Sequence, residues 1–127
     1  MKVITILILG LAAMLIFNAC KPKPLAANDN YRSISVDEAK KMLSEPNVKF
    51  LDVRTSEEVA QGYIDGAWKF DVLDSNFTNN MKALDKDRTY VVYCKSGGRS
   101  VKASNIMLEL GFTDVVNMEG GYTAWNK

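Results

Sequence analysis

Residues 90–100 read Tyr-Val-Val-Tyr-Cys-Lys-Ser-Gly-Gly-Arg-Ser and predict a strand, a tight turn and the start of a helix. The β-branched and aromatic residues from Thr89 to Tyr93 are typical of a buried strand. This strand ends at Cys94, which two glycines and an arginine follow closely. Glycines let backbone N–H groups turn inward, and the N-terminus of a helix carries partial positive charge. We therefore expect the Cys94 thiol to ionise more readily than a free thiol.

The six residues from Cys94 to Arg99 have the chemistry of an anion-binding loop. Loop N–H groups, the helix dipole, Arg99 and Lys95 would all favour a thiolate and a bound oxyanion. The alternative is that Cys94 is a buried residue at the end of a strand and Arg99 a surface cation. The flanking Gly-Gly-Arg-Ser sequence favours a functional site.

Composition narrows the classes of protein that this chain can be. Its 127 residues, 47% of them hydrophobic, suffice for one modest domain. The net charge is +1 with acidic and basic residues mixed, so we expect no nucleic-acid binding. The sequence has no histidine, and its two cysteines, Cys20 and Cys94, are too few for a structural zinc site. We expect no metal and no cofactor, while a disulfide between the two cysteines stays possible.

The N-terminal segment is typical of an exported protein. Lys2 precedes an apolar run from Val3 to Phe17, which is shorter than the roughly 20 residues that span a bilayer. Residues 17–20 read Phe-Asn-Ala-Cys and resemble a bacterial lipobox, in which the cysteine is lipidated and becomes the mature N-terminus. Ordinary secretion with cleavage nearby and an uncleaved membrane anchor are the alternatives.

The sequence thus predicts a lipoprotein signal peptide over residues 1–19, the lipidated Cys20 with a flexible tether over residues 20–32, and a folded domain over residues 33–127. Two prolines and the lack of an apolar period in residues 21–30 indicate an extended tether. We expect an exported protein of the bacterial cell envelope, lipid-anchored on the periplasmic or outer face of a membrane. An acylated Cys20 could not pair with Cys94, which would then be a lone thiol in an oxidising compartment.

The rest of the chain alternates predicted strands and helices. Capping boxes of the form Ser/Thr-x-x-Glu begin helices at Ser35 and Thr55. Strands are predicted over residues 33–34, 48–53, 66–70, 89–93 and 115–118, and helices over residues 35–44 and 55–62, along apolar stripes at 77–84 and 103–110, and before the C-terminus. This order predicts an α/β domain with a mostly parallel sheet. Sites in such sheets lie beyond the carboxyl ends of strands, where Cys94 and Asp52-Val-Arg54 both fall.

Four motifs in order resemble a known family, the rhodanese-like sulfurtransferases, over residues 33–127. The motifs are Leu51-Asp-Val-Arg54 with Glu58, Gly62-Tyr-Ile-Asp-Gly-Ala67, Val91-Val-Tyr-Cys-Lys-Ser-Gly-Gly-Arg-Ser100 and Met118-Glu-Gly-Gly-Tyr-Thr-Ala-Trp125. Tyr63 departs from the pattern, because the family more often has histidine there. The resemblance implies a rhodanese-like α/β fold, with a central, mostly parallel sheet flanked by helices on both faces.

The resemblance also implies roles for individual residues. Cys94 would be the catalytic cysteine that accepts a sulfane sulfur as a persulfide. The substrate-binding residues would be those of the following loop: Lys95, Ser96, Gly97, Gly98, Arg99 and Ser100. Within it, Arg99 and Lys95 would bind the oxyanion of the donor. Asp52, Arg54 and Glu58 look like structural support of the site, with Arg54 paired to Glu58.

The reaction implied is that of a thiosulfate:cyanide sulfurtransferase. The Cys94 thiolate would attack the outer sulfur of thiosulfate or a similar small anionic donor. The persulfide would then pass its sulfur to cyanide, a small thiol or a reduced protein. No histidine is required, because the nucleophile is already ionised and sulfite is a stable leaving group. No long apolar patch outside the predicted core argues for self-association, so we expect a monomer.

Two other functions are kept open. A persulfide carrier would need the same loop, but it would load once and turn over slowly without its partner. A phosphatase or arsenate reductase would also use a cysteine–arginine loop. The loop from Cys94 to Arg99 is one residue shorter than in the family's phosphatase branch, which favours sulfur over phosphate or arsenate.

Overall fold

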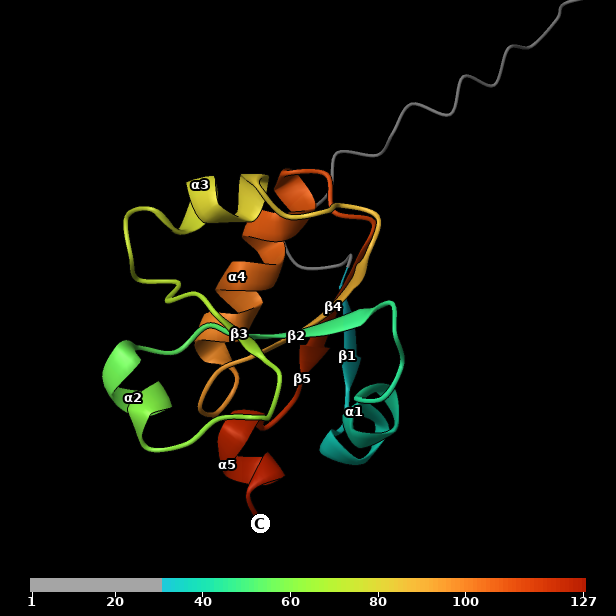
Figure 1. Ribbon diagram of the computed structural model, residues 1–127, viewed down its shortest axis with the longest axis vertical. Coiled ribbons are helices and arrows are strands. Elements are labelled where there is room, and N and C mark those ends of the chain that lie inside the picture. The colour runs from blue at the N-terminus through green and yellow to red at the C-terminus, as the bar shows by residue number, and fades with distance from the viewer. Residues whose placement is uncertain (1–30) are drawn as a thin grey trace, which may run out of the picture.

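The computed structural model describes residues 31–127, which form a five-stranded parallel sheet with helices on both faces (Figure 1). The predicted signal peptide, the lipidation site Cys20 and the tether through residue 30 lie outside the described residues. The elements in chain order are β1 (Arg32–Ile34), α1 (Val36–Met42), β2 (Val48–Asp52), α2 (Ser56–Ala60), β3 (Trp68–Lys69), α3 (Phe77–Lys82), β4 (Thr89–Tyr93), α4 (Gly98–Glu109), β5 (Asp114–Met118) and α5 (Gly121–Trp125). This confirms the predicted α/β fold class.

The strand order is β1-β5-β4-β2-β3, and every neighbouring pair is parallel. From β2 the chain continues outward to β3, whereas from β4 it continues in the opposite direction to β5. The sheet therefore has its topological switch point between β2 and β4, where Asp52 lies opposite Tyr93. Ligand sites of open α/β sheets form at such a point, beyond the carboxyl ends of the strands. Cys94 follows β4 at this point of the sheet.

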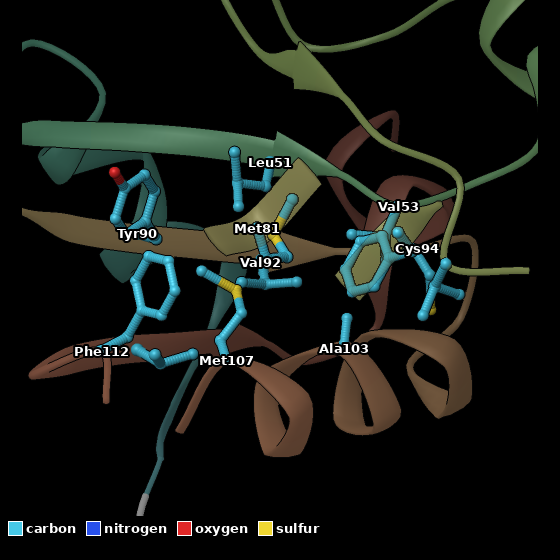
Figure 2. Close-up of a cluster of buried hydrophobic side chains, with 12 residues drawn as sticks. Leu51, Val53, Met81, Tyr90, Val92, Cys94, Ala103, Met107 and Phe112 are labelled. Atoms are coloured by element: carbon cyan, nitrogen blue, oxygen red, sulfur yellow. The ribbon is translucent and has the colours of Figure 1, made fainter. Parts of the chain in front are cut away.

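Successive residues of the central strand β4 face opposite layers, because side chains alternate along a strand. Tyr90 and Val92 join the core that α3 and α4 cover, while Val91 and Tyr93 join the core on the side of α1 and α5. Figure 2 shows the first of these cores, with Tyr90 at one end and Cys94 at the other. The apolar packing of the sheet thus continues up to the cysteine.

Local sequence signals mark the starts of α1 and α2 and the end of α4. The side chains of Ser35 and Thr55 each accept a hydrogen bond from the backbone N–H three residues later, which confirms both as N-caps of the predicted helices. The reciprocal hydrogen bond from the Thr55 backbone N–H to the Glu58 side chain completes the capping box of α2. α4 ends at Glu109, and Gly111 follows with φ at +95°, the left-handed conformation expected for a glycine after a helix.

No helix within residues 31–127 is long and apolar enough to cross a membrane. The same residues contain no group of three or more side chains suited to bind a metal ion.

The strand predicted over residues 66–70 is shorter than expected, because β3 is an edge strand that pairs with β2 at Trp68 and Lys69 alone.

Candidate active site

The loop after β4 wraps its backbone around the sulfur of Cys94. The backbone N–H of Gly97 donates a hydrogen bond to Cys94 Sγ at 3.1 Å, and the Ser100 hydroxyl oxygen lies 3.5 Å from Sγ. The Ser100 hydroxyl donates to the Gly97 carbonyl oxygen at 2.9 Å, which closes the loop on itself. Gly97 has φ at +133°, a conformation that residues with a side chain rarely adopt. Cys94 is only 1% exposed, so its surroundings cover the sulfur almost completely.

The surroundings of Cys94 favour its thiolate form. Burial is the largest single influence and acts to raise the pKa of the thiol. The hydrogen bond between Cys94 Sγ and the Ser100 hydroxyl oxygen and those from the backbone N–H groups of Ser100, Gly97 and Ser96 oppose it, and together they hold the pKa of Cys94 below its ordinary value. No side chain caps the N-terminus of α4 at Gly97, so its first N–H groups can face the sulfur.

The N-terminus of α5 holds the loop from behind, a role that the sequence analysis did not assign. The backbone N–H of Tyr122 donates to the Cys94 carbonyl oxygen at 2.8 Å, and that of Thr123 to the Lys95 carbonyl oxygen at 3.1 Å. Gly121 has φ at +58°, and a Cβ atom there would lie 2.6 Å from the Lys95 carbonyl group. Since these carbonyls are bound on the far side, the loop N–H groups are free to turn toward the sulfur.

Arg54 pairs with Asp52, so the predicted pair of Arg54 with Glu58 is wrong. Arg54 Nη2 donates to Asp52 Oδ2 at 2.7 Å, and Arg54 Nε donates to Asp52 Oδ1 at 2.9 Å. The physical reason is that Asp52, fully buried at the end of β2, needs a cation, and a residue two positions later lies on the same face of an extended chain. Arg54 Nη2 also donates to the Gly62 carbonyl oxygen at 2.7 Å, and its guanidinium lies 4.3 Å from the centre of the Tyr122 ring. The pair therefore connects β2 to the α5 segment that holds the loop.

Glu58 pairs instead with Arg99 at the mouth of the loop. Arg99 Nη1 donates to Glu58 Oε1 at 2.5 Å, and Arg99 Nη2 donates to Glu58 Oε2 at 2.8 Å. The hydrogen bond from Arg99 is the largest cause that lowers the pKa of Glu58 to about 2, against the opposing effect of burial. The same hydrogen bond raises the pKa of Arg99. Both side chains are about one quarter exposed, at 26% for Arg99 and 27% for Glu58.

A pocket of about 240 Å³ lies beside the loop and joins several of the predicted site residues. It is lined by Arg54, Glu58, Gln61, Lys95, Tyr122, Thr123 and Asn126. Lys95 and Glu58 thus line the same cavity, whereas Asp52 is not part of its lining. The site as a whole is a buried, hydrogen-bonded thiol at the switch point of a parallel sheet, with a mixed-charge mouth.

These features define an α/β protein with a buried, hydrogen-bonded cysteine in the loop after its central strand, and comparisons with known proteins assign the family. The model of the rhodanese-like domain matches residues 35–127. The chain therefore belongs to the rhodanese-like domain family.

Named relatives and a solved structure agree with this assignment. The chain is 32% identical over 98 residues to the thiosulfate sulfurtransferase GlpE of Shewanella oneidensis, covering 77% of this chain and 95% of that one. It is 34% identical over 115 residues to the protein HIGH ARSENIC CONTENT 1 of Arabidopsis thaliana, covering 83% of this chain and 66% of that one. The crystal structure of a rhodanese-like domain protein from Staphylococcus aureus superposes with a TM-score of 0.65 at 39% identity, covering 74% of this chain and 90% of that one. Sulfurtransferases are thus among the relatives of this chain.

Proposed function

We propose that this protein is a sulfurtransferase that moves a sulfane sulfur through a persulfide on Cys94. The Cys94 thiolate attacks the outer sulfur of thiosulfate or a similar donor, the sulfur–sulfur bond of the donor breaks, and sulfite leaves with the bonding electron pair. The terminal sulfur of the persulfide then passes to cyanide, a small thiol or a reduced protein, and the thiolate returns. Charge and atoms balance in both steps without an oxidant or a separate base.

The hydrogen bonds that backbone N–H groups of the loop donate to the Cys94 sulfur are the main support for this proposal. The Gly97 N–H and the other N–H groups that lower the pKa of Cys94 can also stabilise the negative charge of a persulfide in the same place. The similarity to GlpE, a thiosulfate sulfurtransferase that aligns with 77% of this chain, supports the same chemistry.

Loading of Cys94 tests the proposal directly. Protein mixed with thiosulfate should gain about 32 Da on the peptide that contains Cys94, the mass of one persulfide sulfur. The Cys94→Ser variant should gain nothing, and the wild type should follow ping-pong kinetics with thiosulfate and cyanide. Failure of the reduced protein to gain this mass from thiosulfate or any other sulfane donor would contradict the proposal.

Turnover measurements separate sulfur transfer from the two competing functions, a persulfide carrier and a phosphatase or arsenate reductase. A persulfide carrier should take up the sulfur once and turn over slowly until a partner protein is added. The name of the Arabidopsis relative raises arsenic chemistry as a second candidate, which the six-residue spacing from Cys94 to Arg99 disfavours. Turnover of arsenate or of an aryl phosphate that is lost in Cys94→Ser would reverse this order.

We further propose that the protein is exported to the bacterial cell envelope and anchored there by lipid on Cys20. The apolar run from Val3 to Phe17 and the Phe-Asn-Ala-Cys sequence that ends it support this proposal. Mass spectrometry of the native protein should then find an acylated cysteine as the N-terminal residue. An unmodified Cys20, or a chain that retains Met1, would contradict it.

A further inference from the structure

We propose that Glu58 sets the charge selectivity of the Cys94 site by occupying the guanidinium of Arg99, so that the protein prefers singly charged sulfur donors to dianionic ones. This inference rests on the proposed sulfur transfer for its substrate class. It concerns the pair at the mouth of the loop and not the chemistry at the sulfur.

The first argument is the geometry of the pair. Both terminal nitrogens of Arg99 donate to Glu58, one to each carboxylate oxygen, at 2.5 and 2.8 Å. A two-point contact of this kind is also the contact that arginine offers to a donor oxyanion. Glu58 therefore stands where the anionic end of a donor would bind to Arg99.

The second argument is that the Glu58 carboxylate is held in place from its own helix. Glu58 is the third residue of α2, and its Oε1 accepts a hydrogen bond from the Thr55 hydroxyl at 3.1 Å and the capping-box hydrogen bond from the Thr55 backbone N–H at 3.5 Å. A carboxylate that is fixed by its own helix start loses little entropy on pairing with Arg99. A donor oxyanion has to compete with a preorganised group for the same guanidinium.

The third argument is the charge balance at the mouth. Asp71 adds a second negative charge that acts on Arg99, and the Cys94 thiolate adds another close by. Lys95, exposed on the loop, is the cation of the predicted site residues that has no carboxylate partner in the structure of residues 31–127. A dianion such as thiosulfate therefore meets a mouth whose main cation is already neutralised, whereas a monoanion such as an alkyl thiosulfonate or a persulfide is repelled less.

Coulomb's law gives the scale of the effect. A unit charge about 6 Å away changes the binding of a dianion by roughly tenfold in water and that of a monoanion by about threefold. Replacing Glu58 by glutamine removes this charge, keeps the size of the side chain and frees Arg99. The ratio of kcat/KM for thiosulfate to that for methanethiosulfonate should then rise by about threefold or more.

The test compares Glu58→Gln with Glu57→Gln, its matched control. Glu57 lies one position earlier on α2, is exposed and forms no ion pair among residues 31–127. The control removes the same charge from the same helix and should leave the donor ratio unchanged. High salt should shrink the difference between wild type and Glu58→Gln, because screening weakens contacts between exposed charges.

A second readout does not depend on sulfur transfer at all. Iodoacetate and iodoacetamide both alkylate a thiolate and differ by one negative charge. Their rate ratio at Cys94, iodoacetate over iodoacetamide, should rise about threefold in Glu58→Gln, stay constant in Glu57→Gln and fall in Arg99→Gln, where the Glu58 charge is left uncompensated.

The outcomes separate the two proposals. If no sulfane donor loads the wild type but the alkylation ratios shift as described, the proposed function fails and the role of Glu58 in charge selectivity holds. If Cys94 loads but neither ratio changes in Glu58→Gln, the selectivity inference is wrong and sulfur transfer stands. If Glu58→Gln does not fold, the ratio in Arg99→Gln decides, and an unchanged ratio there overturns the inference.

Discussion

Two arginine–carboxylate pairs flank the Cys94 loop, and they differ chiefly in burial. The side chains of Arg54 and Asp52 are 4% and 0% exposed, whereas those of Arg99 and Glu58 are 26% and 27% exposed. The first pair lies behind the loop and touches the α5 segment that holds it. The second lies at the mouth of the loop, where both side chains are partly exposed.

Burial decides which of these pairs can exchange partners. A buried charge that loses its partner stays in a medium of low dielectric constant, so opening the Asp52 pair would cost much free energy. Water can replace either partner of a surface pair at small cost, so the Arg99–Glu58 pair can open when an anion arrives. An arginine–carboxylate pair is thus a fixed support when it is buried, as with Arg54 and Asp52, and an adjustable contact when it is exposed, as with Arg99 and Glu58.

The largest effect is expected from Asp52→Asn. This change leaves the buried guanidinium of Arg54 without its carboxylate, which should lower the free energy of unfolding by about 3–5 kcal/mol. Urea denaturation followed by tryptophan fluorescence would measure it. A loss below about 1 kcal/mol would show that water reaches Arg54, and the distinction between the two pairs would then break down.

A smaller effect is expected when the exposed pair is removed whole. The double variant Glu58→Gln, Arg99→Gln should lower the free energy of unfolding by less than about 1 kcal/mol, since both side chains remain accessible to water. The same denaturation measurement checks it, with Glu57→Gln as control. A loss comparable to that of Asp52→Asn would mean that the pair in front of the loop is also a structural support.

The sequence predicted the framework of the molecule far better than these pairings. Strand β4, the loop and both capping boxes depend on residues close together in the chain, so their signals are local and readable. Glu58 and Arg99 are 41 positions apart and meet because α2 and α4 both begin at the switch point of the sheet. A single sequence holds no signal for such a contact.

The contact of α5 with the loop could not be predicted from the sequence for a similar reason. A pair of glycines before a short helix indicates a turn, but it does not say what lies against it. In the fold, the missing side chain of Gly121 leaves room for the carbonyl group of Lys95. That need arises only after β4 and β5 are placed side by side, so it follows from the packing and not from the local sequence.

The smallest effect is a pH dependence that reports the exposed pair alone. The pKa of Glu58 falls from 4.5 to about 2 in the folded protein, chiefly because Arg99 donates to its carboxylate. A lowered pKa in the folded state means that the stabilisation is complete above pH 4.5 and is lost as the pH falls through about 2. The difference in free energy of unfolding between wild type and Glu58→Gln should therefore be constant above about pH 5 and shrink steadily toward pH 2.

Acid titration of the midpoint of urea denaturation measures this difference, with Glu57→Gln expected to follow the wild type. A difference that does not change between pH 5 and pH 2 would mean that the Glu58 charge does not stabilise the folded state, and that the stabilising contact of Glu58 is the neutral one with Thr55.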